Sequence, residues 1–296
     1  MTAPGTEEPA GASPDGLPPL GSVVRGLGLS ARKSLGQHFI LDLNLTRRIA
    51  RAAGPLQGRT VVEVGPGPGG LTRALLLEGA ERVLAVERDE RCRPALDAIA
   101  ARYPGRLQVH YADALGVDWR GLTAGSAGKA VIAANLPYNV ATVLLAGWLE
   151  TEPWPPWFDR MVLMFQREVA ERIVAVPATK AYGRLAVLAQ WRTRARLLFA
   201  LKPEAFTPPP AVASAVVELA SLERLQPDCK VATLSKVTAA AFGQRRKMLR
   251  QSLKPLVRDP EALLAAVGLA PTARGETLSV HDFGRLAYTL ERWPAR

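Results

Sequence analysis

Apolar and polar residues follow two distinct patterns along the middle of the chain. Short runs of consecutive apolar residues are typical of strands that are buried on both faces. These runs are residues 60–65, 82–87, 107–112, 130–134, 161–165 and 214–219. Segments with helical periodicity lie between them, and they are residues 43–53, 71–77, 90–102, 140–149 and 166–174. The first of these helices has Asp42 or Asn44 as its N-cap. This order predicts an α/β domain whose parallel sheet has helices on both faces.

The two ends of the chain differ from this central pattern. Residues up to about Ser22 are rich in Pro, Gly, Ala and Ser and show no apolar periodicity, which is typical of a disordered tail. After about Leu222 the pattern is helical and rich in Lys and Arg. We therefore expect a disordered tail over residues 1–24, the α/β domain over residues 25–222, and a smaller all-α domain over residues 223–296.

Charge and cysteine content narrow the class of protein. Among 296 residues, 38 Lys and Arg against 27 Asp and Glu give a net charge of +11, which favours a nucleic acid as partner before an anionic membrane. A basic chain without such a partner is the plainer alternative. No apolar run approaches the ~20 residues that span a bilayer, and no signal peptide pattern is present. Cys92 and Cys229 lack metal-ligand spacing. We expect a cytoplasmic protein with no metal site and no membrane association.

A glycine-rich turn follows the first predicted strand. Gly65, Gly67 and Gly70 lie between that strand and the next helix, and glycines at this place let the backbone approach a ligand closely. Their spacing also matches the dinucleotide fingerprint. A nicotinamide cofactor and S-adenosylmethionine therefore both stay open at this point, and a tight turn without a ligand is the third interpretation.

Two carboxylates follow the next two strands. Glu87 ends the second strand, about 20 residues beyond the glycine turn, where a carboxylate accepts hydrogen bonds from ribose hydroxyls. Asp113 follows the third strand and can accept a hydrogen bond from the exocyclic amine of adenine. Such residues are often surface carboxylates or helix caps. Their position at the carboxyl ends of successive parallel strands favours a cofactor site.

The fourth strand ends in Asn135-Leu136-Pro137-Tyr138. The side-chain carbonyl of Asn135 and a main-chain carbonyl at Leu136 or Pro137 can hold the two N–H groups of a planar amine such as adenine N6. Pro137 stiffens the turn, and Tyr138 offers a ring face on which a flipped base can stack. Catalysis of this kind rests on positioning and electrostatics, and hydride transfer has no use for it. Because no His or Lys is placed beside Asn135 in the sequence, we expect no general base. A capped turn with Tyr138 in the core is the alternative.

Six segments in this order resemble those of the KsgA/RsmA family, the small-subunit ribosomal RNA adenine dimethyltransferases. They are Arg32-Lys33-Ser34-Leu35-Gly36-Gln37-His38-Phe39, Glu63-Val64-Gly65-Pro66-Gly67, Asn135-Leu136-Pro137-Tyr138, Lys180-Ala181-Tyr182-Gly183-Arg184-Leu185, Phe206-Thr207-Pro208-Pro209-Pro210 and Phe242-Gly243-Gln244-Arg245-Arg246-Lys247. The resemblance runs from about Ala31 to near the C-terminus. It implies a Rossmann-like class I methyltransferase sheet with helices on both faces, followed by a small all-α RNA-binding domain.

The resemblance also implies a reaction and a partner. The family transfers four methyl groups from S-adenosylmethionine to N6 of two adjacent adenosines. These adenosines lie in the 3′-terminal hairpin of 16S rRNA, and the transfer occurs during 30S ribosome biogenesis. We therefore expect 16S rRNA within a 30S assembly intermediate as the partner, and a chain that acts as a monomer.

Site residues are carried over from the family by motif. The implied cofactor contacts are His38, Ile40, Gly65, Gly67, Glu87, Asp113 and Asn135. Phe206 is expected to form the second wall of the base pocket, opposite Tyr138. The family often has Asn at the position of His38 and Leu at that of Ile40, and both replacements are compatible with the cofactor edge. Ala211 and Ala213 stand where the family usually has a basic residue and an Asp, so a charge is missing from a loop near the substrate.

Two other functions occur on the same fold. Erm enzymes methylate an adenosine of large-subunit 23S rRNA and share the cofactor motifs, but the segments around Lys180 and Arg245 favour the small-subunit family. A non-enzymatic nucleic-acid-binding relative is the second alternative. It would have no use for Glu87, Asp113 and Asn135, which are all present.

A basic helix over residues 244–254 is expected to dock RNA. At 100° per residue, Phe242, Leu249 and Leu253 share an apolar stripe, and the basic residues share the neighbouring face. Arg246 lies close to the stripe and is expected to be partly buried. The residues expected to contact RNA are Lys247, Arg250, Lys254, Arg32 and Lys33.

Overall fold

The computed structural model describes residues 13–32 and 35–294. Its strands are β1 (Thr60–Val64), β2 (Arg82–Glu87), β3 (Leu107–Tyr111), β4 (Ala130–Ala134), β5 (Phe158–Gln166), β6 (Thr193–Leu201) and β7 (Ser214–Ser221). Its α-helices are α1 (Leu20–Gly26), α2 (Leu43–Ala52), α3 (Gly70–Leu77), α4 (Arg93–Arg102), α5 (Trp119–Thr123), α6 (Tyr138–Leu149), α7 (Arg167–Ile173), α8 (Arg184–Arg192), α9 (Val231–Gly243), α10 (Leu249–Ser252), α11 (Pro260–Ala266) and α12 (Val280–Leu290). Short 3₁₀ helices are η2 (Glu90–Cys92), η3 (Ala114–Gly116), η4 (Pro203–Ala205) and η5 (Gly275–Thr277).

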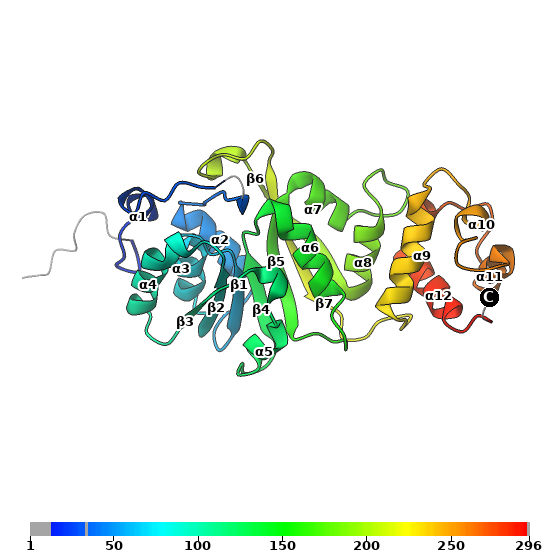
Figure 1. Cartoon of the computed structure of the whole chain (residues 1–296), viewed down its shortest axis with the longest axis horizontal. Coiled ribbons are helices and arrows are strands. Elements are labelled where there is room, and N and C mark those ends of the chain that lie inside the picture. The colour runs from blue at the N-terminus through cyan, green and yellow to red at the C-terminus, as the bar shows by residue number, and fades with distance from the viewer. Residues whose placement is uncertain (1–12, 33–34, 295–296) are drawn as a thin grey trace, which may run out of the picture.

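The strands form a seven-stranded sheet in the order β3-β2-β1-β4-β5-β7-β6 (Figure 1). β1 to β5 are parallel to one another, and β7 is antiparallel to both β5 and β6. The predicted α/β sheet is therefore confirmed, but it is mixed and not wholly parallel, because the strand predicted over residues 214–219 runs antiparallel to its neighbours. The strand order reverses between β1 and β4, and the crevice above such a reversal is where open α/β sheets bind ligands.

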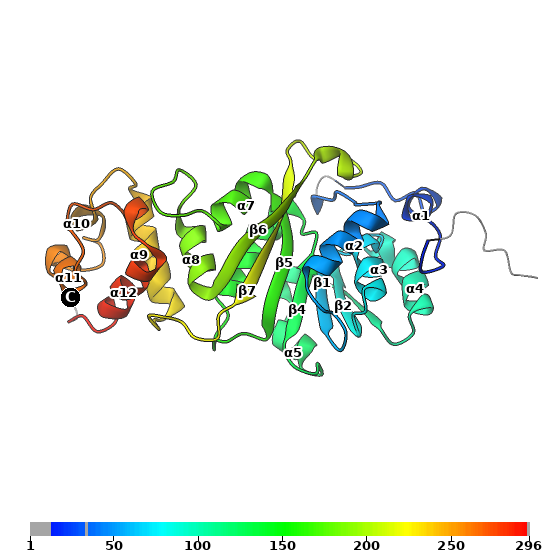
Figure 2. The ribbon, with the colours of Figure 1, turned by 180° about the vertical axis from the view of Figure 1, so that it is seen from behind.

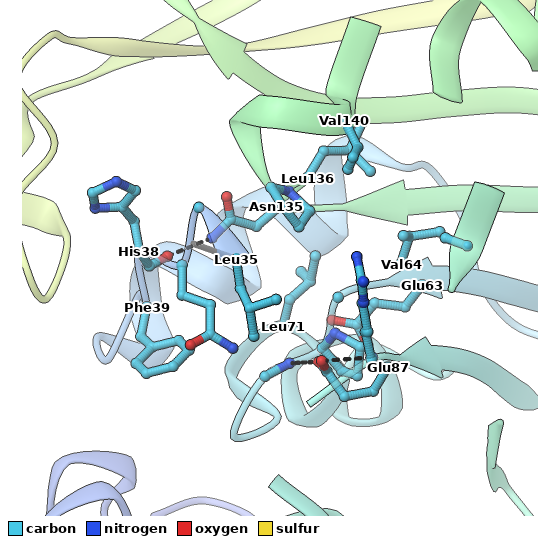
Figure 3. Close-up of a pocket in the computed structure, with 18 of the residues that line it drawn as sticks. Leu35, His38, Phe39, Glu63, Val64, Leu71, Glu87, Asn135, Leu136 and Val140 are labelled. Carbon is cyan, nitrogen blue, oxygen red and sulfur yellow. Dashed lines mark hydrogen bonds between the residues drawn. The ribbon is translucent and has the colours of Figure 1, made fainter. Parts of the chain in front are cut away.

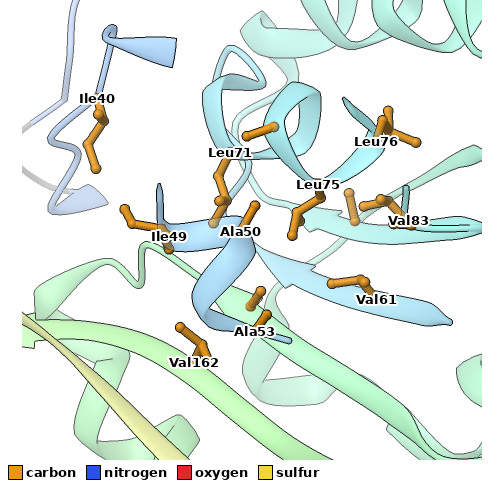
Figure 4. Packing of buried hydrophobic residues seen from close by; sticks show 14 of the residues in the cluster. Ile40, Ile49, Ala50, Ala53, Val61, Leu71, Leu75, Leu76, Val83 and Val162 are labelled. Atoms are coloured by element: carbon orange, nitrogen blue, oxygen red, sulfur yellow. The ribbon is translucent and has the colours of Figure 1, made fainter. Parts of the chain in front are cut away.

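Helices cover both faces of the sheet, as Figures 1 and 2 show. Alternate residues of a strand point to opposite faces. Val61 of β1 belongs to a core with residues of α2 and α3, including Ile49 and Leu75 (Figure 4). Its neighbour Val62 belongs to a second core, which includes Leu145 of α6. The strands are therefore apolar on both faces, which explains their continuous apolar runs.

The C-terminal helices form a third hydrophobic core beside the sheet. It contains Leu234 of α9 and Phe283 of α12, together with Trp191 of α8 and Tyr182. The Tyr182 hydroxyl donates to the Leu278 carbonyl oxygen at 2.9 Å. α8 therefore contributes to this core as well as to the layer on the sheet, and the domain boundary at residue 222 stays a prediction.

Residues 13–24 do not form the disordered tail that their composition predicts. Asp15 is 1 % exposed, and its carboxylate accepts hydrogen bonds from Arg73 of α3 at 2.6 and 2.7 Å. The Arg102 side chain donates to the Asp15 carbonyl oxygen, and Leu20 is buried at the start of α1. These long-range contacts anchor a segment whose own sequence carries no structural signal. Residues 1–12, the rest of the predicted tail, lie outside the described residues.

The basic helix predicted over residues 244–254 is also wrong. α9 ends at Gly243, and α10 begins only at Leu249. The Leu249 N–H donates to the Ala273 carbonyl oxygen at 2.8 Å, so a distant segment supplies the partner that a continuous helix would supply locally. Residues 244–254 therefore cannot be assigned to faces of one helix at 100° per residue. Arg246, which was expected to be partly buried, is exposed.

Among the α-helices and strands, α1, α5, α8 and β6 were not predicted. β6 is an edge strand with partly exposed residues along most of its length, so it lacks the continuous apolar run that marks the central strands. Within residues 13–32 and 35–294, no helix is long and apolar enough to cross a bilayer. The same residues contain no cluster of three or more His, Cys, Asp or Glu that could hold a metal ion.

Candidate active site

A cavity of about 1050 Å³, including its open mouth, lies at the carboxyl ends of β1, β2 and β4 (Figure 3). Three parts of the chain line it: the glycine turn after β1, the carboxylates at the end of β2 and just after β3, and the turn between β4 and α6. Residues 35–40 from the N-terminal segment close a further side. The cavity lies where the strand order reverses, as expected for a ligand site in this fold.

The glycine turn needs its glycines for two separate reasons. Gly65 and Gly67 have φ angles of +69° and +55°, which side chains rarely adopt. A Cβ at Gly67 would also lie 3.0 Å from the Phe39 ring. The Gly67 N–H donates to Glu87 Oε2 at 2.8 Å (Figure 3). The turn is therefore held against the carboxylate at the end of β2.

Glu87 is a buried carboxylate on the cavity wall, with 5 % of its surface exposed. Besides Gly67, the Arg88 and Asp89 N–H groups donate to Glu87 Oε1 at 2.8 and 2.7 Å. Burial raises the pKa of Glu87, although these backbone hydrogen bonds oppose the shift. A rigid carboxylate at the end of β2 matches the ribose acceptor expected from the sequence.

Glu63 of β1 is a second buried carboxylate on this wall, and the sequence analysis assigned it no role. It is 1 % exposed, and the Thr72 hydroxyl donates to Glu63 Oε2 at 2.6 Å. Burial raises the pKa of Glu63 to about 8, and the charge of Glu87 adds to the shift. A carboxylic acid in an otherwise apolar strand is the signal that could have identified it.

Asp113 lies at the rim of the cavity, where it caps η3 by accepting a hydrogen bond from the Leu115 N–H at 3.1 Å. Its other oxygen lies 3.3 Å from Arg88 Nη1. Both side chains are about half exposed or more, so this ion pair is weak and can open. Arg88 therefore pairs with the Asp113 carboxylate, which was expected to accept a hydrogen bond from the adenine amine.

The turn after β4 presents two unengaged acceptors. Asn135 Nδ2 donates to the His38 carbonyl oxygen at 2.9 Å (Figure 3). Among the described residues, none donates a hydrogen bond to Asn135 Oδ1 or to the Leu136 carbonyl oxygen. The Pro137 carbonyl oxygen accepts from the Val140 and Ala141 N–H groups of α6 at 3.1 and 3.0 Å. The sequence left open whether the carbonyl oxygen of Leu136 or that of Pro137 accepts from the substrate. Of the two, only the Leu136 oxygen accepts no hydrogen bond from the described residues.

Tyr138, the first residue of α6, borders the same cavity. Its hydroxyl shares a hydrogen bond of 2.5 Å with the Ser214 hydroxyl. Its ring stacks on the His38 imidazole with a centroid separation of 5.4 Å. A histidine distant in the sequence does reach this turn, because a segment 97 residues earlier in the chain brings His38 there. The expectation that no general base is needed stays a prediction.

Ile40 lines the cavity as expected, but Phe206 does not. Phe206 is 3 % exposed and packs in the core that includes Leu201 and Val216. Its side chain packs among apolar residues, and it follows β6 in the chain, a strand that the sequence did not predict. In this structure Phe206 therefore does not form a wall opposite Tyr138.

The residues expected to contact RNA differ in their exposure and in their partners. Lys247 is exposed in the turn between α9 and α10, whereas Arg250 lies 3.6 Å from Glu261 and is partly buried. Lys254 is exposed beyond α10. Arg32 is exposed near the N-terminal side of the cavity, and Lys33 lies outside the described residues.

Comparison with known proteins places the chain in a family. Residues 28–291 match the family model described as ribosomal RNA adenine dimethylase. A ribosomal RNA small subunit methyltransferase A of Xanthobacter autotrophicus is 63 % identical over 276 residues, which cover 93 % of this chain and 95 % of that protein. A protein of the same name from Rhodopseudomonas palustris is 62 % identical over 276 residues, with the same two coverages.

Two solved structures share the fold over most of the chain. The dimethyladenosine transferase of Plasmodium falciparum is similar with a TM-score of 0.67 and 22 % identity, covering 83 % of this chain and 95 % of its own. The 23S rRNA methyltransferase ErmE has a TM-score of 0.63 and 22 % identity, covering 86 % and 99 %. With the matched family model and the 63 % identical relative, the chain belongs to the ribosomal RNA adenine dimethylase family.

Proposed function

We propose that this chain transfers methyl groups from S-adenosylmethionine to N6 of two adjacent adenosines in the 3′-terminal hairpin of 16S rRNA. The observation that carries the proposal is the pair of unengaged acceptors, Asn135 Oδ1 and Leu136 O, beside the ring of Tyr138. The names of the relatives from Xanthobacter and Rhodopseudomonas support a small-subunit RNA as substrate.

The cavity wall fits the cofactor. S-adenosylmethionine, when bound, supplies a methyl group on a positively charged sulfur. Glu87 is fixed by three backbone N–H groups and can accept from ribose hydroxyls. Asp113 can accept from the adenine amine once Arg88 moves aside. Gly65 and Gly67 keep side chains out of the space next to them.

The turn after β4 fits the amine that receives the methyl group. Asn135 Oδ1 and Leu136 O can each accept one N–H of adenine N6, which directs the nitrogen lone pair away from the base plane and towards the methyl donor. The proton that N6 loses with each transfer passes to water. The amide and carbonyl acceptors do not titrate near neutral pH, so positioning carries the catalysis.

The turn between α9 and α10 fits an RNA-docking surface better than α10 itself. Arg245, Arg246 and Lys247 are all exposed there, and Arg245 also lies 3.5 Å from Glu276. Arg245 Nη1 donates to the Lys180 carbonyl oxygen at 3.2 Å, which brings the exposed Lys180 to the same surface. The C-terminal end of α9 lies on the same side of the molecule as α7 (Figure 1). α7 follows the carboxyl end of β5, so this is also the side on which the strands end. We assign phosphate contacts to this basic turn, which we define as residues 245–247.

The partner in this proposal is 16S rRNA within a 30S assembly intermediate, met in the cytoplasm by a monomer of this chain. The main alternative substrate is 23S rRNA, because ErmE shares the fold. An identity of 22 % carries the fold alone, so it does not favour that substrate.

Transfer of tritium from labelled S-adenosylmethionine separates the two substrates. Under-methylated 30S particles, 50S particles and free 23S rRNA are incubated with the full chain, and the labelled nucleoside is identified after digestion. We expect N6,N6-dimethyladenosine from the 30S particles only. Label in 23S rRNA, or none in any RNA, would overturn the proposal.

A further inference from the structure

The imidazole of His38 is stacked, with an offset, on one ring face of Tyr138. The two ring centroids lie 5.4 Å apart with an angle of 29° between the ring planes, and both residues line the cavity. Figure 3 shows the His38 side chain directed away from Glu87 and the glycine turn, while its carbonyl oxygen faces Asn135. The ring is therefore associated with the base side of the cavity and not with the cofactor side.

The backbone of His38 is fixed independently of its ring. Its carbonyl oxygen accepts from Asn135 Nδ2, and the next residue, Phe39, pairs with Thr207 through hydrogen bonds of 2.9 and 2.8 Å. The ring itself is held by a hydrogen bond of 2.8 Å from Nδ1 to the Pro208 carbonyl oxygen. Since a carbonyl oxygen only accepts, Nδ1 is the donor. Rotation of the side chain would break one hydrogen bond and one stack and leave the backbone in place.

The space between the two rings does not admit a third ring. Aromatic atoms in contact are separated by about 3.5–4 Å, so a base between two rings would place those rings roughly 7–8 Å apart. The observed 5.4 Å falls short of this. An adenine that stacks on this face of Tyr138 must therefore replace His38.

We propose that His38 is a placeholder for the target base and thereby contributes to base selection. The inference rests on the proposed function. In the RNA-free enzyme His38 covers Tyr138, and the arriving base displaces it by rotation of the side chain. Displacement costs His38 its stack on Tyr138 and its hydrogen bond to Pro208. Only a base that stacks on Tyr138 and also donates hydrogen bonds to Asn135 and Leu136 compensates for this loss. A small pyrimidine, which stacks less well, recovers less.

The test compares the binding of two RNA hairpins, one with and one without target bases that can enter the cavity. One synthetic hairpin carries two adjacent adenosines in its loop, and the other carries abasic sites at those positions. Dissociation constants are measured with saturating S-adenosylhomocysteine, so that no transfer occurs. The ratio of the abasic to the adenosine dissociation constant reports base insertion alone, because phosphate contacts are common to both RNAs.

In His38→Ala the ratio should rise about 3- to 10-fold, because a competing stack and hydrogen bond are gone and the open state becomes more populated. His38→Phe keeps a ring on Tyr138, so its ratio should rise less than that of His38→Ala. His281→Ala serves as the matched control, since His281 is exposed on α12 outside the cavity.

An unchanged or lower ratio in His38→Ala would overturn the inference, because His38 would then be indifferent to the base or would help to hold it. A purely structural role would lower the melting temperature and leave the ratio unchanged. Failure of the proposed function is distinguishable, since it appears as absent methylation of 30S particles by the wild type.

Discussion

Asn135 Nδ2 donates a hydrogen bond of 2.9 Å to the carbonyl oxygen of His38, across 97 residues of sequence. This contact fixes which end of the amide faces the cavity. The nitrogen is engaged, so the oxygen is presented to the substrate. The N-terminal segment thereby orients an acceptor that lies at the end of β4.

Asn135→Asp tests this orientation. The carboxylate cannot donate to the His38 carbonyl oxygen and is repelled by it, so the side chain should rotate and the acceptor should be misplaced. Loss of one positioned polar group lowers rates by about 10²- to 10³-fold in comparable sites. We expect a fall of this order in single-turnover methylation. The control is Asn44→Asp at an exposed position of α2, and a wild-type rate for Asn135→Asp would remove the amide from the mechanism.

Glu87→Gln should weaken cofactor binding more than RNA binding. The neutral side chain loses hydrogen bonds to a charged acceptor, which are worth about 1.5–3 kcal/mol. The dissociation constant for S-adenosylhomocysteine should therefore rise by about 10- to 100-fold in calorimetry. The matched control is Glu90→Gln, three residues further on and exposed. Because Glu87 also holds the Gly67 N–H, the melting temperature should fall as well. An unchanged dissociation constant would exclude Glu87 from the site.

Glu63 should make the stability of the free enzyme depend on pH. Its pKa in the folded protein is about 8, above the ordinary value of 4.5, because it is buried and close to Glu87. As the pH rises from 4.5 to 8, the unfolded chain therefore loses this proton before the folded chain does, and stability decreases. Between pH 6 and 8 the wild type should lose about 2 kcal/mol more than Glu63→Gln.

Urea unfolding at pH 6 and pH 8 measures this difference between the two proteins. Glu204→Gln is a control with an exposed carboxyl group. Equal losses in wild type and Glu63→Gln would mean that Glu63 ionises normally in the folded protein.

That the glycine turn and the two carboxylates line one cavity was predictable, because the signals are local. Gly65 and Gly67 follow a buried strand, Glu87 ends the second strand, and Asp113 follows the third. In a parallel sheet, all such strand ends meet at one edge. The identity of the free carbonyl, Leu136 and not Pro137, depended on helix α6, whose first turn engages the Pro137 oxygen.

Contacts between distant segments were not predictable. Asp15 and Arg73 lie 58 residues apart, and the composition around Asp15 indicates only disorder. The position of the His38 ring depends on Tyr138 and on Pro208. In the sequence, the helical periodicity continues through residues 244–254, although α9 ends at Gly243. The true interruption arises because Leu249 bonds to Ala273 in another segment.

The interrupted helix changes the prediction for RNA binding. If residues 244–254 formed one helix, Lys247, Arg250 and Lys254 would share a face. In the structure, Arg250 lies 3.6 Å from Glu261, and its buried Nε has no hydrogen-bond partner among the described residues. Lys247 instead shares the exposed basic turn with Arg245 and Arg246. The basic turn should therefore supply phosphate contacts, and Arg250 with Lys254 should supply fewer.

Two variants separate these surfaces. One replaces Arg245, Arg246 and Lys247 by Gln, and the other replaces Arg250 and Lys254 by Gln. Each phosphate contact contributes about 0.7–0.9 to the slope of log K against log salt concentration. The first variant should lower the magnitude of the slope by roughly 2–3, whereas the second should lower it by about 1 or less. Binding titrations with the RNA hairpin at several salt concentrations measure both slopes, and cofactor affinity should stay unchanged in both variants. If the first variant gave the wild-type slope, the RNA surface would lie elsewhere, and the exposed Arg32 at the N-terminal side of the cavity would be the next position to replace.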